Sequence, residues 1–379
     1  MSPRTAIVHD WLTGMRGGEK VLEAICDLYP DATLFTLVRV PGTVSDTIER
    51  RTVRTSFVQR LPRPGRLYRH YLPLYPAAVE MFDLDEYDLV ISSSHCAVKS
   101  VIVRGDARHI CYCHSPMRYA WDQFDAYFGR ERVGLAMNLL MRPVMGAMAR
   151  WDRATADRVH RYLAISQYVA RRIALYYNRQ SSIVYPPVET TFYTPSPSGP
   201  SGGSSGSGHG DGFLVVSALV PYKRVELAIA AARLAKVPLT IVGDGPERAA
   251  LEARGGPGIR FLGWRTNEEI RDLYRSSIAT ILPGEEDFGI VPLEAQACGR
   301  PVVALGRGGA LETAIDGETG VLVEPGEQAL AEGLKRAAAM VWDPVRIRQH
   351  AEKFSRERFV REIEQAIDET MTAPAGQRW

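Results

Sequence analysis

The sequence predicts an α/β protein built from two parallel-sheet domains. Short apolar runs rich in Val and Ile alternate with segments of helical periodicity along the 379 residues. This length is about that of two ordinary domains. The stretch from Pro195 to Gly212 is almost entirely Gly, Ser and Pro, a composition that cannot bury apolar surface. We therefore expect one sheet domain on each side of a mobile linker.

The expected domain boundaries follow this change in composition. The first domain covers residues 1–194, the linker residues 195–212 and the second domain residues 213–354. A last segment, 355–379, places apolar side chains at helical spacing behind Ser355, a favourable helix cap. We expect this segment to form a helix that packs at the junction of the two domains.

Each expected strand is a short apolar run bounded by turn or helix signals. In the first domain, strands are expected at Thr5–His9, Thr33–Val38, Leu89–Ser92, His109–Cys113, Tyr162–Ile165 and Ser182–Tyr185. In the second domain, they are expected at Phe213–Ser217, Leu239–Val242, Ile259–Leu262, Ala279–Leu282, Pro301–Ala304 and Val321–Val323. Because the connecting segments have helical periodicity, the strands of each domain are expected to run parallel.

Charge and composition disfavour several classes of protein. The 46 basic and 44 acidic residues give a net charge of +2, too small to indicate nucleic acid as the main partner. The sequence has no run of about 18 uncharged apolar residues, the length that a membrane-spanning helix needs. Its start shows no charged-then-apolar leader, and its five cysteines are scattered, as in proteins with reduced thiols. We therefore expect a cytoplasmic protein.

The stretch from Leu282 to Gly299 is the most informative about function, because an apolar run passes there through an acidic loop into an Ala-rich segment. Glu286 and Glu294 are separated by seven residues. A helix that begins near Phe288 to Ile290 would point free N–H groups, carrying about half a positive charge, at an anion such as a diphosphate. A carboxylate is favourable beside that anion where it accepts hydrogen bonds from sugar hydroxyls. The combination predicts a sugar-nucleotide site.

This loop resembles that of the retaining GT-B glycosyltransferases of the GT4 family. Further segments match the same family in order, each at an expected strand-to-helix junction. They are Arg16–Lys20, His114–Trp121, Ser217–Arg224, Ile241–Pro246, Phe261–Gly263 and Gly308–Glu312. The resemblance covers nearly the whole chain and implies the GT-B fold, in which two Rossmann-like domains face a central cleft.

The resemblance also implies roles for individual side chains. Lys223 matches the lysine that binds the diphosphate, Glu286 the glutamate that faces the transferred sugar, and Glu294 the glutamate that holds the ribose hydroxyls. His114 matches a histidine near the transferred sugar. Satisfied packing is the usual explanation of a lone histidine, but its Ser-Pro context at a strand end favours the functional one.

Other matching positions act through backbone groups or charge. The family commonly has an arginine five residues before its lysine, where this chain has Ala218, so Arg224 is the candidate for a second cation. Base recognition in such folds depends on the loop at Gly263 and Trp264. Backbone groups that approach the phosphates are implied at Gly17, Gly18, Phe288, Gly289 and Ile290.

The expected mechanism uses no metal and no other cofactor. The sequence has no Asp-x-Asp signal in a loop suited to bridging a diphosphate through Mg²⁺. Charge on the leaving group would then be met by Lys223, Arg224 and helix N-termini. The resemblance implies that the anomeric configuration is retained, with the acceptor attacking from the face that the diphosphate leaves.

The opening segment His9–Thr13, with the motifs around His114 and Lys223, is similar to the mannosyltransferases of bacterial O-antigen and exopolysaccharide synthesis. The resemblance favours GDP-mannose as donor and a saccharide acceptor, linked to a polyprenyl diphosphate in that pathway. A UDP-hexose donor stays open. So does a different enzyme of the same fold, the sugar-nucleotide 2-epimerase, which needs acid and base groups but no acceptor.

A basic segment in the first domain indicates contact with anionic lipid. Seven arginines occur between Arg50 and Arg69 with no acidic residue, interleaved with aromatic residues and leucines. Such a segment suits the inner face of the cell membrane or a polyprenyl diphosphate. A solvated basic face beside a diphosphate site is the equally simple alternative.

Two other classes are disfavoured. A two-lobed solute-binding protein ordinarily carries an export signal, and none is seen at the start of the sequence. A nicotinamide dehydrogenase is expected to show the order G-x-G-x-x-G after a strand, and neither Gly14–Gly18 nor Gly243–Gly245 has it.

Overall fold

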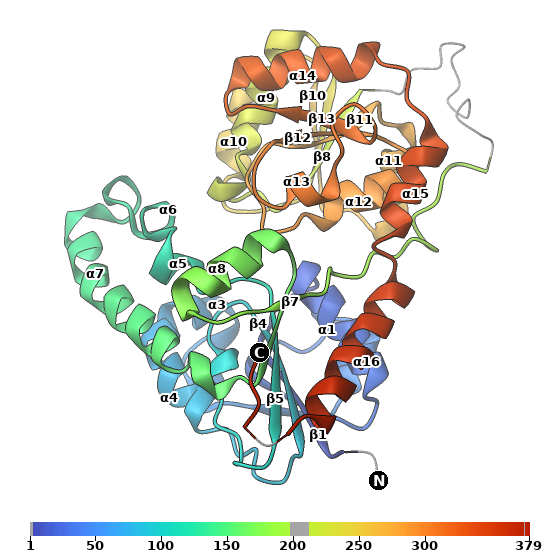
Figure 1. The fold of residues 1–379 in the computed structure, drawn as a ribbon. Coiled ribbons are helices and arrows are strands. Elements are labelled where there is room, and N and C mark those ends of the chain that lie inside the picture. The colour runs from blue at the N-terminus through green and yellow to red at the C-terminus, as the bar shows by residue number, and fades with distance from the viewer. Residues whose placement is uncertain (1–2, 198–211, 375) are drawn as a thin grey trace. The chain divides into compact units, whose positions relative to one another are not determined.

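The computed structural model describes residues 3–197, 212–374 and 376–379, and it contains two compact units (Figure 1). The first unit comprises Met1–Pro187 and Phe359–Trp379, and the second comprises Val188–Arg358. The chain therefore passes from one unit to the other twice, after Pro187 and after Arg358.

The first unit is built on a seven-stranded parallel sheet with the order β3-β2-β1-β4-β5-β6-β7. The interior strand β1 is buried along its whole length, and its Ile7 pairs with Leu34 on β2 and Ile91 on β4. The strands are β1 (Thr5–Leu12), β2 (Thr33–Arg39), β3 (Val53–Thr55), β4 (Leu89–Ser94), β5 (Arg108–Cys113), β6 (Arg161–Ala164) and β7 (Ser182–Ile183).

Helices of the first unit connect these strands. The α-helices are α1 (Gly17–Leu28), α2 (Asp46–Glu49), α3 (Pro64–Leu67), α4 (Tyr75–Glu80), α5 (Arg118–Trp121), α6 (Phe124–Phe128), α7 (Arg130–Ala154) and α8 (Gln167–Tyr177). Short 3-10 turns are η1 (Phe57–Arg60), η2 (Tyr68–Leu74), η3 (Val98–Ser100) and η4 (Ala156–Arg158). The long helix α16 (Arg356–Thr372) begins at the end of the second unit and continues into the first.

The second unit is built on a six-stranded parallel sheet with the order β10-β9-β8-β11-β12-β13. Its strands are β8 (Phe213–Val216), β9 (Leu239–Val242), β10 (Ile259–Gly263), β11 (Ala279–Leu282), β12 (Val302–Leu305) and β13 (Gly320–Val323). Its helices are η5 (Pro221–Lys223), α9 (Val225–Ala235), α10 (Arg248–Arg254), α11 (Asn267–Ser276), α12 (Ile290–Ala297), α13 (Ala310–Thr313), α14 (Glu327–Ala339) and α15 (Pro344–Glu352).

The prediction of two Rossmann-like parallel sheets is confirmed. In each sheet the strand order reverses at one place, between β1 and β4 in the first unit and between β8 and β11 in the second. Loops that leave the carboxyl ends of two such strands run to opposite faces, and the space between them is where ligands bind in open α/β sheets. The fold therefore indicates one such position in each unit.

The passage between the units differs from the expected linker. Residues 198–211 of that stretch lie outside the described residues, but the residues on both sides of it belong to the second unit. Before it, Tyr193 packs in one cluster with Leu214 and Tyr274. The passage after Pro187 consists of ordinary residues, so composition does not reveal it.

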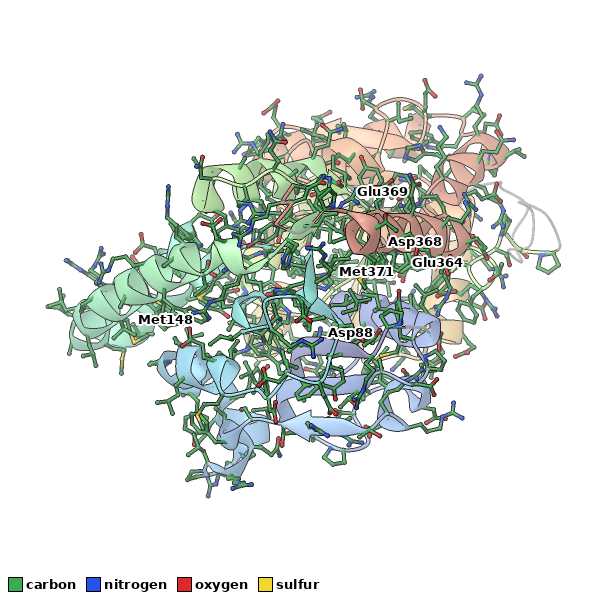
Figure 2. All side chains as sticks on the ribbon, turned by 60° about the horizontal axis from the view of Figure 1, so that its bottom comes forward. Asp88, Met148, Glu364, Asp368, Glu369 and Met371 are labelled. Atoms are coloured by element: carbon green, nitrogen blue, oxygen red, sulfur yellow. The ribbon has the colours of Figure 1, made fainter. Side chains whose placement is uncertain are left out.

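From Phe359 onwards, the last helix packs against the first unit. The ring of Phe359 lies 5.6 Å from that of Tyr112 on β5, measured between centroids, and Arg161 on β6 donates to Glu369 over 2.7 Å. The acidic side chains Glu364, Asp368 and Glu369 lie on the exposed side of α16 (Figure 2). The apolar stripe expected for this helix is thus used within one unit.

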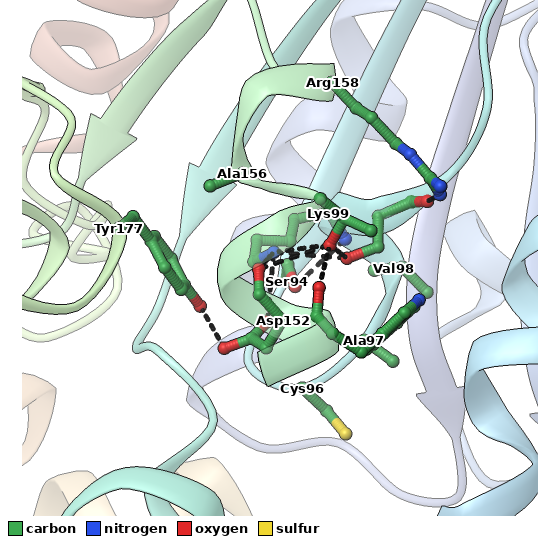
Figure 3. Close-up of polar contacts among 12 residues, drawn as sticks. Ser94, Cys96, Ala97, Val98, Lys99, Asp152, Ala156, Arg158 and Tyr177 are labelled. Atoms are coloured by element: carbon green, nitrogen blue, oxygen red, sulfur yellow. Dashed lines mark hydrogen bonds and ion pairs between the residues drawn. The ribbon is translucent and has the colours of Figure 1, made fainter. Parts of the chain in front are cut away.

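A buried ion pair ties together four elements of the first unit (Figure 3). Lys99 on η3 lies 3.0 Å from one oxygen of Asp152 on α7, and both side chains are fully buried. The second oxygen of Asp152 accepts hydrogen bonds from Trp121 on α5 over 2.7 Å and from Tyr177 on α8 over 2.9 Å. Since each member has its partners, the cluster holds α5, α7 and α8 against the end of β4.

Replacing Asp152 with alanine is therefore expected to destabilise the protein strongly, because it leaves the Lys99 ammonium buried without its counter-ion. We expect a loss of about 3–5 kcal/mol in the free energy of unfolding. Denaturant titration measures it. The matched control is Asp157→Ala, which removes an exposed carboxylate 3.3 Å from Arg179 and is expected to cost at most about 1 kcal/mol. Equal losses for the two variants would contradict this account of the cluster.

Candidate functional site

In the second unit, Lys223 and Glu286 meet at the place where the strand order reverses. Lys223 ends η5, which follows β8, and Glu286 lies in the loop that follows β11. The Lys223 ammonium forms an ion pair and a hydrogen bond with the Glu286 carboxylate. Gly284 allows this approach, because a Cβ on it would lie 2.7 Å from the carbonyl oxygen of Tyr222. Folding thus brings together two side chains that are 63 positions apart.

Gly308 and Gly309, which follow β12, pack against the backbone of the acidic loop that contains Glu286. The amide of Gly309 donates to the carbonyl of Glu286 over 2.8 Å. A Cβ on Gly308 would lie 2.4 Å from that same carbonyl oxygen, and one on Gly309 would lie 2.3 Å from the Cα of Phe288. The Gly308–Gly309 motif therefore has a structural reason: only glycine lets the backbone pass this close to the loop.

The helix expected after the loop begins at Ile290, and Gly289 forms its cap with φ of 93°. The left-handed conformation of Gly289 suits a residue without a side chain. Pro292, the third residue of α12, has no N–H group, so Ile290 and Val291 carry the amides of the first turn. Phe288 is buried just before them. These amides and the Lys223 ammonium place positive charge at the same loop edge.

Glu294 lies deeper than the sequence indicates. Its residue is only 4% exposed, and its carboxylate accepts a hydrogen bond from the hydroxyl of Tyr274 over 3.0 Å. Burial, followed by the Glu294 charge, raises the pKa of Tyr274 well above its ordinary value, so the phenol stays protonated and donates. The hydrogen bond from Tyr274 thus fixes the orientation of the Glu294 carboxylate. The role of Glu294 towards ribose hydroxyls stays a prediction.

Arg224 and Gly263 lie at the same edge of this sheet. Arg224 follows Lys223 directly, has a φ of 54°, and donates through Nε to Glu226 over 2.5 Å. The carboxylate of Glu226 therefore partly neutralises the positive charge of Arg224. Gly263 ends β10 with a φ of 72°, and its carbonyl accepts from the amide of Gly243. The indole of Trp264 beyond it is 73% exposed.

In the first unit, Gly17, Gly18 and His114 occupy the corresponding edge. Gly17 and Gly18 are the first residues of α1, after β1, and His114 follows β5. A Cβ on Gly18 would lie 3.8 Å from the imidazole of His114 and 3.9 Å from that of His9. The structure therefore brings Gly18 and His114 into contact, as the shared edge predicts. The pKa of His114 lies well below its ordinary value because of burial and the nearby His95 and His9, so its ring is neutral at neutral pH.

Sequence reasoning assigned no role to several polar residues beside His114. Asp10 is fully buried at the end of β1, and its carboxylate accepts four backbone N–H groups over 2.7–3.1 Å. Those groups belong to residues 95–98, the turn after β4. Ser93 bridges His9 and His114. A signal was present in the sequence, since β4 ends in three serines and is unusually polar for a buried strand.

The predicted site residues thus form one group in each unit, and their assigned roles stay predictions. Within the described ranges, no three His, Cys, Asp or Glu side chains are grouped so that they could hold a metal ion. Metal independence also stays a prediction. Among the helices that the structure describes, none is both long and apolar enough to cross a membrane.

Two family descriptions match consecutive parts of the sequence. Residues 16–192 match "Glycosyltransferase Family 4", and residues 209–354 match "Glycosyl transferases group 1". The matches include the segments around Gly17, His114, Lys223 and Glu286.

Curated relatives are similar over part of their length. A D-inositol 3-phosphate glycosyltransferase of Mycobacteroides abscessus is 27% identical over 63% of this chain and 61% of its own. A GDP-mannose-dependent alpha-(1-6)-phosphatidylinositol monomannoside mannosyltransferase of Mycolicibacterium smegmatis is 32% identical over 42% of this chain and 48% of its own. The chain therefore spans about half to six tenths of these relatives.

Solved structures agree on the fold. Anabaena Alr3699/HepE, crystallised with UDP and glucose, superposes with a TM-score of 0.68 at 21% identity, over 96% of this chain and 99% of its own. Sucrose-phosphate synthase from Thermosynechococcus elongatus gives a TM-score of 0.68 at 17% identity, over 98% and 100%. With the sheet topology and both family matches, these findings show that the chain belongs to glycosyltransferase family 4 and has the GT-B fold.

Proposed function

We propose that this protein is a retaining, metal-independent hexosyltransferase that transfers mannose from GDP-mannose to a lipid-linked saccharide in bacterial surface-polysaccharide synthesis. Membership of glycosyltransferase family 4 supports the reaction class. The observation that carries the proposal is the meeting of Lys223 and Glu286 beside the first turn of α12, at the reversal of strand order.

The arrangement provides what the transfer requires. The bond between the anomeric carbon and the diphosphate oxygen breaks, and the acceptor hydroxyl oxygen bonds to that carbon from the same face. The hydroxyl proton passes to the departing diphosphate, whose negative charge the Lys223 ammonium and the α12 amides stabilise. Lys223 pairs with Glu286 in the structure, so a diphosphate would compete with this carboxylate for the ammonium. Glu286 would then turn its oxygens to sugar hydroxyls.

The choice of donor rests on the sequence motifs and on one relative. The Mycolicibacterium smegmatis relative is described as GDP-mannose-dependent, whereas the Anabaena structure contains UDP and glucose. A UDP-hexose is therefore the second candidate donor. A sugar-nucleotide 2-epimerase also binds a nucleotide sugar, but its product differs because no acceptor is glycosylated.

Membrane contact is part of the proposal, and the exposed arginines of the first unit support it. Arg60 on η1, Arg63 just before α3 and Arg66 on α3 are exposed, and no ion pair joins them to a carboxylate among the described residues. Apolar and aromatic residues that follow them, such as Tyr68 and Leu72, pack into the core instead. We define Arg60, Arg63 and Arg66 as the basic stripe. An anionic bilayer is the partner that its charge fits, at the inner face of the cell membrane.

Glu286→Ala is expected to lower the rate of nucleotide release from the donor at least about 100-fold, because a group that contacts the reacting sugar is lost. The melting temperature is expected to change little, since the loop backbone is held by Gly309. Glu285→Ala is the matched control, because Glu285 is its exposed neighbour and is expected to keep near-normal turnover. Near-normal turnover of Glu286→Ala would contradict the assigned role.

The donor and the metal are tested together by thermal shift and product analysis. With GDP or GDP-mannose at 100 times its dissociation constant, stability is expected to rise by about 2.7 kcal/mol, and UDP is expected to have a smaller effect at equal concentration. Release of GDP is expected to continue in EDTA. A larger stabilisation by UDP would overturn the choice of base, and turnover abolished by EDTA would overturn metal independence.

Binding to vesicles tests the basic stripe. Replacing Arg60, Arg63 and Arg66 with alanine is expected to weaken binding to anionic vesicles about 100-fold, at about 1 kcal/mol for each arginine. The control variant makes the same change of charge at the exposed Arg254, Arg346 and Arg361 and is expected to bind normally. Binding that does not respond to salt, or that both variants weaken equally, would contradict membrane contact through the stripe.

A further inference from the structure

A chain of polar contacts runs from His114 into the interior of the first unit. Nε2 of His114 lies 2.9 Å from the Ser93 hydroxyl, and that hydroxyl lies 3.1 Å from Nδ1 of His9. Nε2 of His9 lies 3.8 Å from Oε1 of Glu19. His9 and Ser93 are fully buried, and Glu19 is 4% exposed. Since water has almost no access to these atoms, each polar atom must find its hydrogen-bond partner within the protein.

The Ser93 hydroxyl can donate to only one of its two imidazole partners, because it has one hydrogen. The other ring must then donate to the hydroxyl oxygen. The hydrogen bonds that join His9, Ser93 and His114 can therefore run in either of two directions. The two directions place the proton on different nitrogens of His114. Whatever fixes the proton of His9 fixes the proton of His114 as well.

Glu19 sets the direction. Its Oε2 accepts the backbone N–H of Arg16 over 3.1 Å, and its other oxygen faces Nε2 of His9. At 3.8 Å the contact is electrostatic rather than a hydrogen bond, and a carboxylate attracts an N–H and repels a nitrogen lone pair. Burial acts to raise the pKa of Glu19, but the nearby His9 and His95 outweigh it and bring this pKa below its ordinary value, so the carboxylate is ionised.

The consequence passes along the chain in two steps. With its proton on Nε2, His9 accepts at Nδ1 from the Ser93 hydroxyl. The Ser93 oxygen then accepts the Nε2–H of His114, which leaves the lone pair of His114 on Nδ1. No hydrogen-bond partner of this Nδ1 occurs among the described residues.

The other polar groups around the rings do not compete for these atoms. His95 lies 6.2 Å from His114 and 5.8 Å from His9, measured between ring centroids, and its Nδ1 faces Asp10 at 3.3 Å. The ring of Tyr112 lies 5.3 Å from that of His114, but its hydroxyl donates to the carbonyl of Val184.

We propose that Glu19, His9 and Ser93 are positioning residues that hold His114 as the Nε2–H tautomer and so make its Nδ1 an acceptor for a sugar hydroxyl. The inference rests on the proposed function, in which His114 lies near the transferred sugar. It adds a requirement to that function: His114 accepts a hydrogen bond from the sugar and does not donate one.

Nitrogen-15 NMR of histidine-labelled protein at neutral pH tests the tautomer directly, with His114→Gln to assign the signal. We expect Nδ1 of His114 to be unprotonated and Nε2 protonated. In Glu19→Gln, the amide oxygen is expected to keep the Arg16 N–H, so the NH₂ group faces His9. The chain then reverses, and His114 is expected to become the Nδ1–H tautomer.

Two further variants keep the test decisive. Glu23→Gln on the same helix is the matched control and is expected to leave the tautomer unchanged. Ser93→Ala cuts the chain and is expected to give a mixture of both tautomers. An Nδ1–H tautomer in the unaltered protein, or an unchanged tautomer in Glu19→Gln and Ser93→Ala, would overturn the proposal.

The same variants connect the tautomer with turnover. Glu19→Gln is expected to lower nucleotide release at least about tenfold, with an unchanged dissociation constant for GDP, because the amide oxygen keeps the Arg16 N–H and GDP carries no transferred sugar that could contact His114. Full turnover by a reversed tautomer would overturn the proposed need for an acceptor at Nδ1. If the unaltered protein released no nucleotide from any donor, the proposed function would fail, while the tautomer measurement would still report on the chain.

Discussion

The reversal of strand order in each parallel sheet is the constraint on which the site depends. All strands of a parallel sheet present their carboxyl ends at one edge, and two neighbouring loops diverge there only where the order reverses. In the second unit this is between β8 and β11, where Lys223 and Glu286 meet. In the first unit it is between β1 and β4, where the turn after β4 is held by Asp10. The topology of the sheet therefore brings together residues that are distant in the sequence.

Charge at these edges is balanced by groups of the chain itself. In the second unit, an ammonium, a carboxylate and the first amides of α12 occupy one loop edge, and glycines let the backbones approach closely enough to hold them. At the edge of the first unit, Asp10 and Glu19 are buried and burial lowers the pKa of His114 and His95, so the polar contacts around Ser93 are ordered by hydrogen-bond direction. One edge is thus suited to an anion and the other to neutral hydroxyls.

Much of the fold could be predicted from the sequence, because buried parallel strands are continuous apolar runs. Leu239–Val242 and Ala279–Leu282 were predicted to the residue. Strand β3 was missed, since an edge strand of three residues with an exposed arginine has no apolar signal, and its pairing is set by β2. The passage after Pro187 was missed because Gly, Ser and Pro show where a chain cannot bury surface, not where a domain ends. The motifs predicted Lys223 and Glu286, but Ser93 depends on a partner 84 positions away.

The central claim is that the loop edge with Lys223 binds the diphosphate of a nucleotide sugar. A crystal structure of the protein with GDP measures this most directly. The account predicts that a β-phosphate oxygen lies within about 3 Å of the Lys223 ammonium and that the phosphate faces the amides of Ile290 and Val291. A diphosphate bound away from these groups, with Lys223 still paired to Glu286, would contradict it.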